Sequence, residues 1–256
     1  MTTETSERII FQNETCIVIN KTAGESSEAP NMGEEWKGSC FPVHRIDVPV
    51  TGCLLIAKTQ DAASFLSSAF ASSAAIDEQS GKKTEGQTDD QEKERRVKKY
   101  YWAIAEMPAD LGSLAPEAQL VHWITENRKL NKSFATADIN QITRKQRGSI
   151  APRKAIMNYK IIGKGERYIF LEIELVSGRH HQIRAQLAAL GLYIKGDLKY
   201  GARRSEKGGG IRLHAHSLSF PDPLNPKEQI EVKVLPHEMD ALWTAFKSEF
   251  DKSHCA

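Results

Sequence analysis

The stretch YIFLEIELV, residues 168–176, places Glu172 and Glu174 on one side of the chain and apolar residues between them on the other. Because successive side chains of a β-strand point to opposite faces, this alternation predicts a strand. A second run, CLLIAK at residues 53–58, has five apolar residues in succession. A short apolar run of this kind is typical of a strand buried on both faces. These two stretches predict that a β-sheet forms the framework of the fold.

Weaker patterns outward from these stretches add more strands and some helices. Further strands are predicted at residues 9–21, as a pair around the turn-like Asn13-Glu14, and at residues 100–105 and 229–234. Helices are predicted at residues 61–75, at residues 182–190 with Gly191 as the stop, and at residues 237–250 with Met239, Leu242, Trp243 and Phe246 inward. Strands outnumber helices and do not alternate with them regularly. We therefore expect an α+β fold with a mixed, largely antiparallel sheet and flanking helices.

Residues 77–96 differ from their surroundings, because they contain seven acids and five bases but no aliphatic or aromatic side chain. Such a segment buries too little apolar surface to offset the entropy lost on ordering. It is predicted to be a mobile surface insertion. The chain length of 256 residues is compatible with one large domain. We expect a single domain over residues 1–256, interrupted by this insertion.

Composition and targeting signals exclude several protein classes. The fractions of hydrophobic and charged residues, 40% and 27%, are those of a globular protein rather than a disordered or fibrous one. No apolar run approaches the ~18 residues of a membrane span, and the N-terminus lacks the features of a secretory signal. The four cysteines include no C-x-x-C pair and suggest neither a disulfide framework nor a zinc site. We expect a cytoplasmic protein that does not enter membranes.

The net charge of +2 hides an uneven distribution. Residues 121–154 contain eight Lys or Arg against two acids, and residues 178–216 again contain eight against two, with four histidines. If the two stretches meet in space, they form a positive surface suited to a polyanion. The alternative is that both are solvated faces, neutralised by acids elsewhere in the fold.

A cluster of polar residues precedes the apolar run at residues 53–58. The sequence HRIDVPVTG, residues 44–52, brings an imidazole, a guanidinium and a carboxylate (His44, Arg45 and Asp47) onto a loop ahead of a rigid strand. Loops held by rigid elements are common positions for catalytic groups. The structural alternative is that Asp47 caps a turn and pairs with Arg45.

Three later stretches favour the catalytic interpretation of this loop over the structural one. In KYYWA, residues 99–103, alternation places Lys99, Tyr101 and Ala103 on one face of a strand. The segment GRHHQIR follows at residues 178–184, and GDLKYG at residues 196–201. Together with residues 44–52, and with the sequence RLHA at residues 212–215, these stretches resemble the motifs of the RluA-type family of RNA pseudouridine synthases. The resemblance keeps the family's motif order and runs from about residue 8 to residue 246.

The resemblance implies a catalytic fold with a central basic cleft and an isomerase that detaches uracil from ribose at N1 and reattaches it through C5. It implies RNA, ribosomal or transfer, as the partner, and no metal or cofactor. The implied catalytic residues are Asp47, Arg184 and Tyr101. The Asp47 carboxylate would stabilise the positive charge that develops at C1′, and Arg184 would keep that carboxylate ionised. Tyr101 would stack on the uracil. Whether Asp47 acts as a nucleophile, as an electrostatic partner or as a base at the sugar stays open.

Binding residues are also implied. The target base must leave the RNA stack. Arg45 matches a family position whose side chain would fill the space left by that base. The structural alternative is a contact of Arg45 with Asp47 or with the backbone. The other implied substrate-binding residues are His44, Lys99, Arg179, His181, Gln182 and Leu213. We expect a monomer.

Two departures from the family pattern support a competing hypothesis. Val48 stands where many members have Arg, and Val50 where a Thr is usual. A non-catalytic RNA-binding protein that keeps the scaffold is therefore the alternative. A third possibility is a histidine-based metallohydrolase, suggested by the pairs His180-His181 and His214-x-His216.

Overall fold

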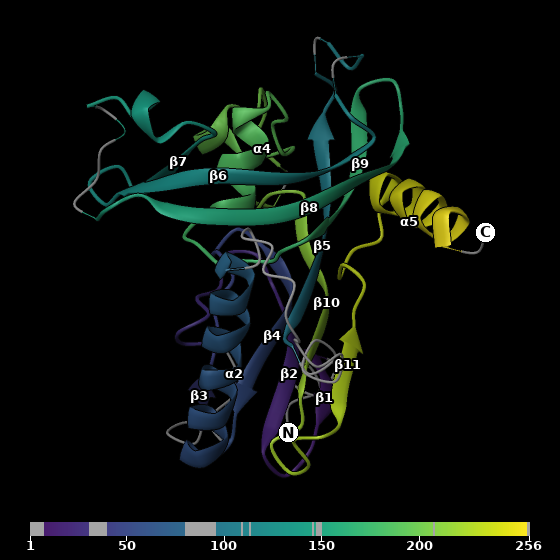
Figure 1. Cartoon of the computed structure of the whole chain (residues 1–256). Helices are drawn as coiled ribbons and strands as arrows, with labels where there is room; N and C mark the ends of the chain where they lie inside the picture. Colours follow the sequence, from purple (N-terminus) through teal and green to yellow (C-terminus); the bar gives the residue numbers. More distant parts are fainter. Residues whose placement is uncertain are drawn as a thin grey trace. The chain divides into compact units, whose positions relative to one another are not determined.

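The structure is a computed structural model that describes residues 8–30, 40–79, 96–108, 110–112, 114–144, 146, 150–206 and 208–254. Its strands form a mixed, mostly antiparallel open sheet, as predicted (Figure 1). The chain divides into two compact units. Unit 1 consists of Met1–Tyr100 and His214–Glu238, and unit 2 of Tyr101–Leu213 and Met239–Ala256. The single domain over residues 1–256 stays a prediction.

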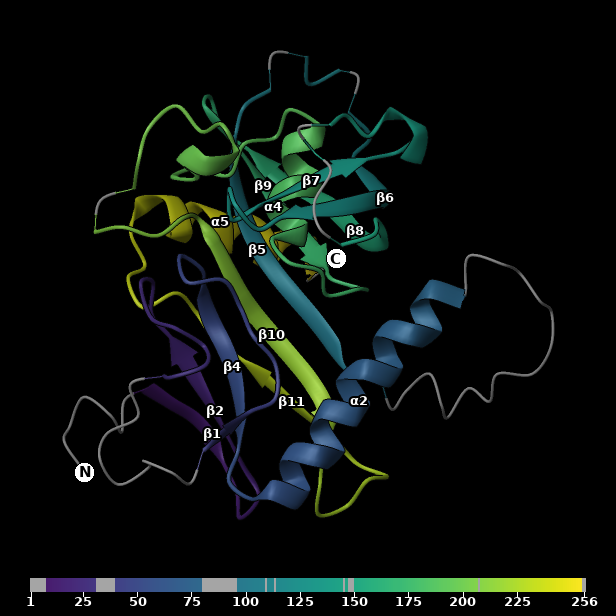
Figure 2. The ribbon, with the colours of Figure 1, turned by 90° about the vertical axis from the view of Figure 1, so that its left-hand side faces the viewer.

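Unit 1 is built around a hydrogen-bonded series of strands in the order β1-β2-β4-β10, with β3 on β4 and β11 on β10. Helix α2 follows β4 and is seen along its length in Figure 2. The bounds are β1 Ile9–Gln12, β2 Cys16–Lys21, β3 Phe41–Pro42, β4 Thr51–Ala57, α2 Gln60–Gln79, β10 Leu213–Pro221 and β11 Gln229–Lys233. These elements confirm the strand pair predicted at residues 9–21 and the strands predicted at 53–58 and 229–234.

Strand β4 is buried on both faces, as the continuous apolar run at residues 53–58 predicted, and β2 is buried in the same way. Cys53 and Leu55 point to the face that also receives Leu66 of α2, whereas Leu54 and Ile56 form a separate cluster with side chains of β2. Helix α2 extends to Gln79, four residues beyond the predicted end. The mobile insertion predicted at residues 77–96 lies outside the described residues from 80 to 95.

The close approach of β4 and β10, the parallel pair of unit 1, depends on Gly52. Its partner across the pair is Ala215, and a Cβ added at Gly52 would lie 2.3 Å from the Ala215 carbonyl oxygen. Gly52 also has a φ of +114°, a conformation that other residues rarely adopt. The glycine that ends the HRIDVPVTG segment is therefore required by the packing of the sheet.

Unit 2 contains an antiparallel series in the order β9-β8-β6-β7, together with β5, α4 and α5. The bounds are β5 Lys98–Glu106, β6 Glu117–Asn127, β7 Lys132–Thr136, the short helix η2 Ile139–Gln141, β8 Arg153–Lys164, β9 Tyr168–Glu174, α4 Gln182–Ala189, the short helix η3 Leu198–Tyr200 and α5 Ala241–His254. The predictions of β5, β9 and α4 are confirmed. Strands β6, β7 and β8 were missed, although Leu120, His122 and Ile124 alternate with more exposed residues along β6.

Helix α5 begins at Ala241, four residues after the predicted start. The reason is Asp240, whose carboxylate accepts hydrogen bonds from the backbone N–H groups of Leu242 (3.2 Å) and Trp243 (3.1 Å) and so caps the helix. The predicted inward face is confirmed, since the two buried residues Trp243 and Phe246 pack with Trp102 of β5.

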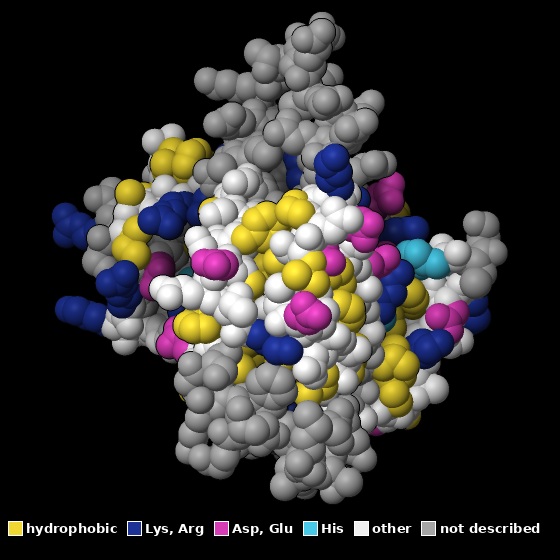
Figure 3. Space-filling view, turned by 90° about the horizontal axis from the view of Figure 1, so that it is seen from below, with side chains coloured by type: hydrophobic (Ala, Val, Ile, Leu, Met, Phe, Trp, Pro, Cys, Tyr) yellow, Lys and Arg dark blue, Asp and Glu magenta, His cyan; other side chains and the backbone are white. Residues whose placement is uncertain are grey.

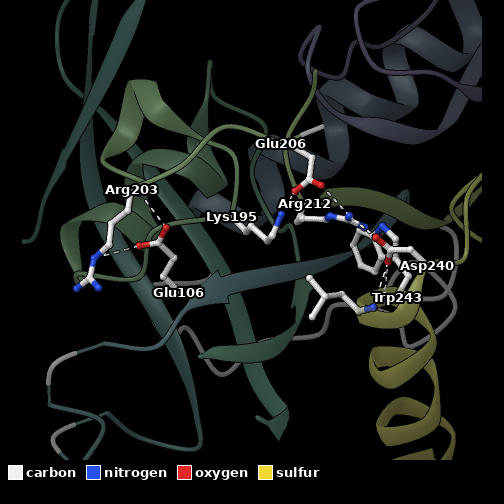
Figure 4. A network of polar contacts seen from close by, with 8 residues as sticks. Glu106, Lys195, Arg203, Glu206, Arg212, Asp240 and Trp243 are labelled. Atoms are coloured by element: carbon white, nitrogen blue, oxygen red, sulfur yellow. Dashed lines mark hydrogen bonds and ion pairs between the residues drawn. The ribbon is translucent and has the colours of Figure 1, made fainter. Parts of the chain in front are cut away.

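A charged network holds the segment that precedes β10 to the start of α5 (Figure 4). Arg212 donates to Glu206 at 2.8 Å and to the capping residue Asp240, and Glu206 also pairs with Lys195. The Arg212 guanidinium lies 5.7 Å from the ring centre of Trp243. This network fixes both ends of the loop that carries the GDLKYG motif.

Candidate active site

The loop between β3 and β4 carries Asp47 in unit 1. Asp47 is half-buried, and its carbonyl accepts a hydrogen bond of 2.9 Å from the N–H of Val50, which closes a turn ahead of β4. Strand β4 is almost wholly buried. The carboxylate therefore stands on a turn that a rigid strand supports, as the sequence predicted.

Two anchors hold the residues on either side of Asp47. The buried Ser27 hydroxyl donates to the carbonyl of Ile46 at 2.8 Å and accepts from the N–H of the same residue at 3.1 Å. The fully buried Lys21 ammonium donates to the carbonyl of Val48 at 3.2 Å. Because both flanking peptides are tied to the segment 21–27, the backbone of Asp47 has little freedom to move within unit 1. Neither anchor was assigned from sequence. The Lys21 position, a lysine at the end of an apolar strand, was a usable signal, whereas Ser27 carried none.

His44 makes structural contacts beside this loop. Its Nε2 accepts a hydrogen bond of 2.9 Å from the N–H of Leu55, and its ring stacks on Phe70 at 4.8 Å. Burial lowers the pKa of His44 to about 3, and the positive charge of Lys99 acts in the same direction. The ring is therefore neutral at physiological pH. Its part in substrate binding stays a prediction, as does that of Lys99.

Thr51 and His214 connect the HRIDVPVTG segment, residues 44–52, to the RLHA segment, residues 212–215. They face each other across β4 and β10, with 2.8 Å between the Thr51 hydroxyl and His214 Nδ1. His214 Nε2 lies 3.0 Å from the carbonyl of Val234, and His216 Nδ1 lies 2.8 Å from the same carbonyl. Each imidazole thus uses a ring nitrogen for a structural hydrogen bond. In the described ranges, His, Cys, Asp and Glu side chains form no group of three that could hold a metal ion.

Arg45 and Val48 are the exposed residues of the loop. The Arg45 guanidinium pairs with Glu28 at 3.2 Å, and more than two thirds of both side chains is exposed. An ion pair as exposed as this one contributes little to stability. Val48 is 50% exposed. That the Arg45 side chain fills the space left by an extruded base stays a prediction.

Arg184 occupies a buried position on α4 in unit 2. Its Nε and one Nη donate to the two oxygens of Asp197 at 2.6 and 2.8 Å, and both side chains are at least 95% buried. A two-point contact of this kind sets the plane of the guanidinium. Asp197 belongs to the GDLKYG motif, but sequence reasoning gave it no role. A guanidinium carries five N–H donors, so it can serve a second acceptor while Asp197 holds it.

Tyr101 lies in β5 in unit 2 and is 7% exposed. Trp102 and Ile104 point to the α5 side, so the alternation of the strand puts Tyr101 on the opposite face, as predicted. Asp47 belongs to unit 1, whereas Tyr101 and Arg184 belong to unit 2. The catalytic roles of all three stay predictions.

The segment before α4 is held by Gln182 and His181. The Gln182 carboxamide accepts from the Arg179 N–H at 2.9 Å and donates to the carbonyl of Ile156 on β8 at 3.0 Å. His181 has a φ of +51°, which is uncommon for a residue other than glycine. Backbone conformations of this kind concentrate at functional sites. Leu213, the last predicted binding residue, is buried at the start of β10.

Tyr200 connects three parts of unit 2, and the sequence analysis gave it no role. Its hydroxyl accepts from the Ser133 N–H at 2.8 Å and lies 3.0 Å from His181 Nδ1. Its ring lies 4.8 Å from both the Lys132 ammonium and the Arg184 guanidinium carbon. The tyrosine of the GDLKYG motif therefore links β7, the start of α4 and the Arg184–Asp197 pair.

The two basic stretches of the sequence meet within unit 2. Lys132 donates to the carbonyl of Lys199 at 2.5 Å, and Lys199 donates to the carbonyl of Asn131 at 3.0 Å. Arg179 in turn donates to the carbonyl of Lys154 at 3.3 Å. These contacts bring the two stretches together, but Arg184, Lys195 and Arg212 of the second stretch pair with acids of unit 2. On the face drawn in Figure 3, charged side chains of both signs are mixed with hydrophobic ones. The positive surface stays a prediction.

None of the helices in the described part of the chain has both the length and the apolar character needed to cross a membrane.

Comparisons with known proteins agree with the motif pattern. A family model described as RNA pseudouridylate synthase matches residues 15–189, which is more than half of the chain and includes Asp47, Tyr101 and Arg184. An uncharacterized RNA pseudouridine synthase of Mycoplasma genitalium is 25% identical over 93% of this chain and 74% of its own length. In Vibrio parahaemolyticus, ribosomal large subunit pseudouridine synthase C is 24% identical over 87% of this chain and 64% of its own length, and tRNA pseudouridine synthase C is 23% identical over 93% and 94%.

The fold is also similar to that of a solved structure. Human RNA pseudouridylate synthase domain containing 4 superposes with a TM-score of 0.65 and 17% sequence identity, covering 97% of this chain and 94% of that chain.

Proposed function

Because the chain belongs to the RNA pseudouridylate synthase family, we propose that it converts specific uridines of structured ribosomal or transfer RNA into pseudouridine. In this isomerisation the bond between N1 and C1′ breaks and a bond between C5 and C1′ forms. C5 loses one proton and N1 gains one, so no oxidant, reductant or water is consumed. The observation that carries the proposal is the match of the family model to a segment in which Asp47 is anchored on both sides.

Asp47 is the proposed catalytic carboxylate. Cleavage of the glycosidic bond develops positive charge at C1′, and a carboxylate can meet that charge as a nucleophile, as an electrostatic partner or as a base at the sugar. Each role needs the carboxylate in one position, because catalysis depends on the alignment of the reacting atoms. The anchors at Ile46 and Val48 supply that constraint. The target uridine must leave the RNA stack first, at a cost of a few kcal/mol.

Arg184 and Tyr101 are proposed to act on the same nucleotide as Asp47. A guanidinium favours the ionised form of a carboxylate close to it, and this is the role that we propose for Arg184 toward Asp47. The contact with Asp197 supports this role, since it sets the orientation of the Arg184 guanidinium. For Tyr101 we propose stacking on the uracil, because an aromatic ring can hold an extruded base by its face.

The relatives do not choose between RNA classes, since a ribosomal and a transfer RNA enzyme are similar to this chain at 24% and 23% identity. We propose that lysine and arginine side chains of the two basic stretches bind RNA phosphates. Binding should therefore weaken as the salt concentration rises.

The test is to incubate the purified chain with unmodified ribosomal and transfer RNA transcripts and to map pseudouridine in each. We expect conversion at specific uridines, no conversion by Asp47→Asn at equal RNA binding, and normal conversion by Asp61→Asn, the same substitution at an exposed position of α2. Normal conversion by Asp47→Asn would remove Asp47 from the mechanism. Tight RNA binding by the wild-type chain without conversion of any transcript would instead support a non-catalytic RNA-binding protein.

A further inference from the structure

Unit 2 contains a cavity of about 100 Å³ between β6, the start of β8 and the segment that precedes α4. Its lining combines apolar side chains, among them Ile124 and Ile150, with three charged ones and an imidazole: Glu126, Arg153, Arg179 and His180. All of these residues belong to unit 2. The cavity can therefore be described without reference to Asp47.

The sheet sets the position of one wall. Ile124 and Arg153 are direct partners across β6 and β8, so their side chains share a face. Glu126 lies two residues beyond Ile124 and points to the same side of β6. Glu126 forms an ion pair with Arg128 at 3.7 Å, which is longer than a hydrogen bond. A carboxylate has capacity for several donors, so this pair is compatible with a further contact.

The opposite wall is held in place by hydrogen bonds. The main chain and the guanidinium of Arg179 are tied to Gln182 and Lys154 respectively. His180 Nδ1 lies 2.9 Å from the Ser133 hydroxyl, and its ring stacks on His181 with 3.8 Å between centres. Because these contacts fix both walls, the cavity is preformed, which lowers the entropy cost of filling it.

The lining matches the parts of one nucleotide. Aliphatic and imidazole side chains accept the faces of a base, two guanidinium groups suit a phosphate, and a carboxylate accepts hydrogen bonds from a base edge. Guanine presents two adjacent donors, N1–H and the N2 amino group, to the two oxygens of a carboxylate. Uracil presents a single N–H between two carbonyl oxygens, and these oxygens would repel the carboxylate.

We propose that this cavity binds an unpaired guanosine of the substrate RNA. The Watson–Crick edge of its base enters the cavity between Ile124 and His180 and donates to Glu126, and its phosphate contacts Arg153 and Arg179. The inference rests on the proposed function for the identity of the RNA as substrate. It adds a specificity determinant, since Glu126 selects the base that enters this cavity.

Binding to short RNA tests the cavity without turnover. The probes are a labelled short oligouridine and the same oligomer with one central guanine. We expect the wild-type chain to prefer the guanine-containing oligomer by about tenfold, as one good two-point base contact allows. Glu126→Gln should reduce that preference to less than about twofold, because an amide cannot accept both N–H groups. Arg153→Ala should weaken binding of both oligomers and lower the slope of log affinity against log salt by about 0.7, the value for one phosphate contact on a single strand.

Lys164→Ala is the matched control, since it removes an exposed cation from the opposite end of the same strand, and it should keep the guanine preference. The inference is overturned if wild-type shows no preference for guanine, or if Glu126→Gln keeps the wild-type preference. A guanine preference in a chain that converts no transcript overturns the proposed function alone. Conversion of a transcript without any effect of the Glu126 and Arg153 variants overturns the cavity alone.

Discussion

The ammonium group of Lys21 donates a hydrogen bond of 3.2 Å to the main-chain carbonyl of Val48, the residue that follows Asp47. It also donates to the carbonyls of Thr22 at 2.8 Å and Glu25 at 2.9 Å. An ammonium has three N–H donors, and here three carbonyls receive them. The charged form of Lys21 therefore ties the Asp47 turn to the end of β2.

The charge of Lys21 should leave a signature in the pH dependence of stability. Burial lowers the pKa of Lys21 to about 8 from 10.5, while the charges of Glu25 and Asp47 act in the opposite direction. Between these two values the unfolded chain binds more protons than the folded chain, so the contribution of Lys21 to the free energy of unfolding rises with pH. We expect urea unfolding of wild-type to gain stability relative to Lys21→Met between pH 8 and pH 10. Parallel pH curves for the two proteins would contradict this expectation.

Ser27→Ala should reduce catalysis through Asp47. The substitution removes both hydrogen bonds to Ile46 and lets the neighbouring carboxylate move. We expect kcat to fall by about tenfold to a hundredfold with little change in KM, because small misplacements of reacting groups are costly. Ser26→Ala, the same change at the exposed neighbour, should leave both constants at wild-type values. A rise in KM at unchanged kcat would assign Ser27 to RNA binding instead.

Asp197→Ala should destabilise the chain by about 3–5 kcal/mol, because it leaves the Arg184 charge without the two-point contact that compensates its burial. Urea unfolding measures this loss. The comparison is Arg203→Ala, which breaks a pair with Glu106 at 3.7 Å in which the arginine side chain is 87% exposed, and which should cost less than ~1 kcal/mol. Equal effects of the two variants would contradict the assignment of Asp197 as a buried partner.

Gly163 of β8 makes room for α5. A Cβ at this position would lie 2.9 Å from the Cβ and 2.7 Å from the Cγ of Glu249. Gly163→Val should therefore displace the helix and lower the free energy of unfolding by about 1–3 kcal/mol. Adding Glu249→Ala should recover part of the loss, which a double-mutant cycle detects as non-additivity. Strict additivity would mean that the two residues do not meet.

Acid should weaken unit 1 through two buried histidines. Burial lowers the pKa of both His44 and His214 from 6.5 to about 3. Below pH 6.5 the two histidines bind protons in the unfolded chain but stay neutral in the folded chain. The free energy of unfolding therefore decreases as the pH falls toward 3. We expect the loss of stability between pH 7 and pH 5 to be smaller in His214→Gln than in wild-type. An unchanged loss would show that His214 does not stay neutral in the folded chain.

Local patterns predicted much of the framework. The alternation at residues 168–176 and the apolar run at 53–58 became β9 and β4, and Gly191 ends α4 with a φ of +74°. The start of α5 was misplaced because its apolar spacing continues to Met239, whereas the capping carboxylate of Asp240 decides where the backbone becomes helical. Strand β6 was missed because its buried positions include the polar residues His122 and Thr125, so that its apolar alternation is incomplete.

The motifs and their order indicated the family, which the family model confirms, and suggested the candidates Asp47, Tyr101 and Arg184, since the identity and spacing of residues are properties of the chain before it folds. Which groups hold those candidates was decided by folding. Ser27 and Ile46, which are hydrogen-bonded, are 19 residues apart in the sequence, and Arg184 and Asp197 are 13 residues apart. A local sequence pattern does not predict partners at such separations. A hydrogen bond depends on the distance between two atoms, and burial, which neutralises His44 and lowers the pKa of Lys21, depends on everything packed around them.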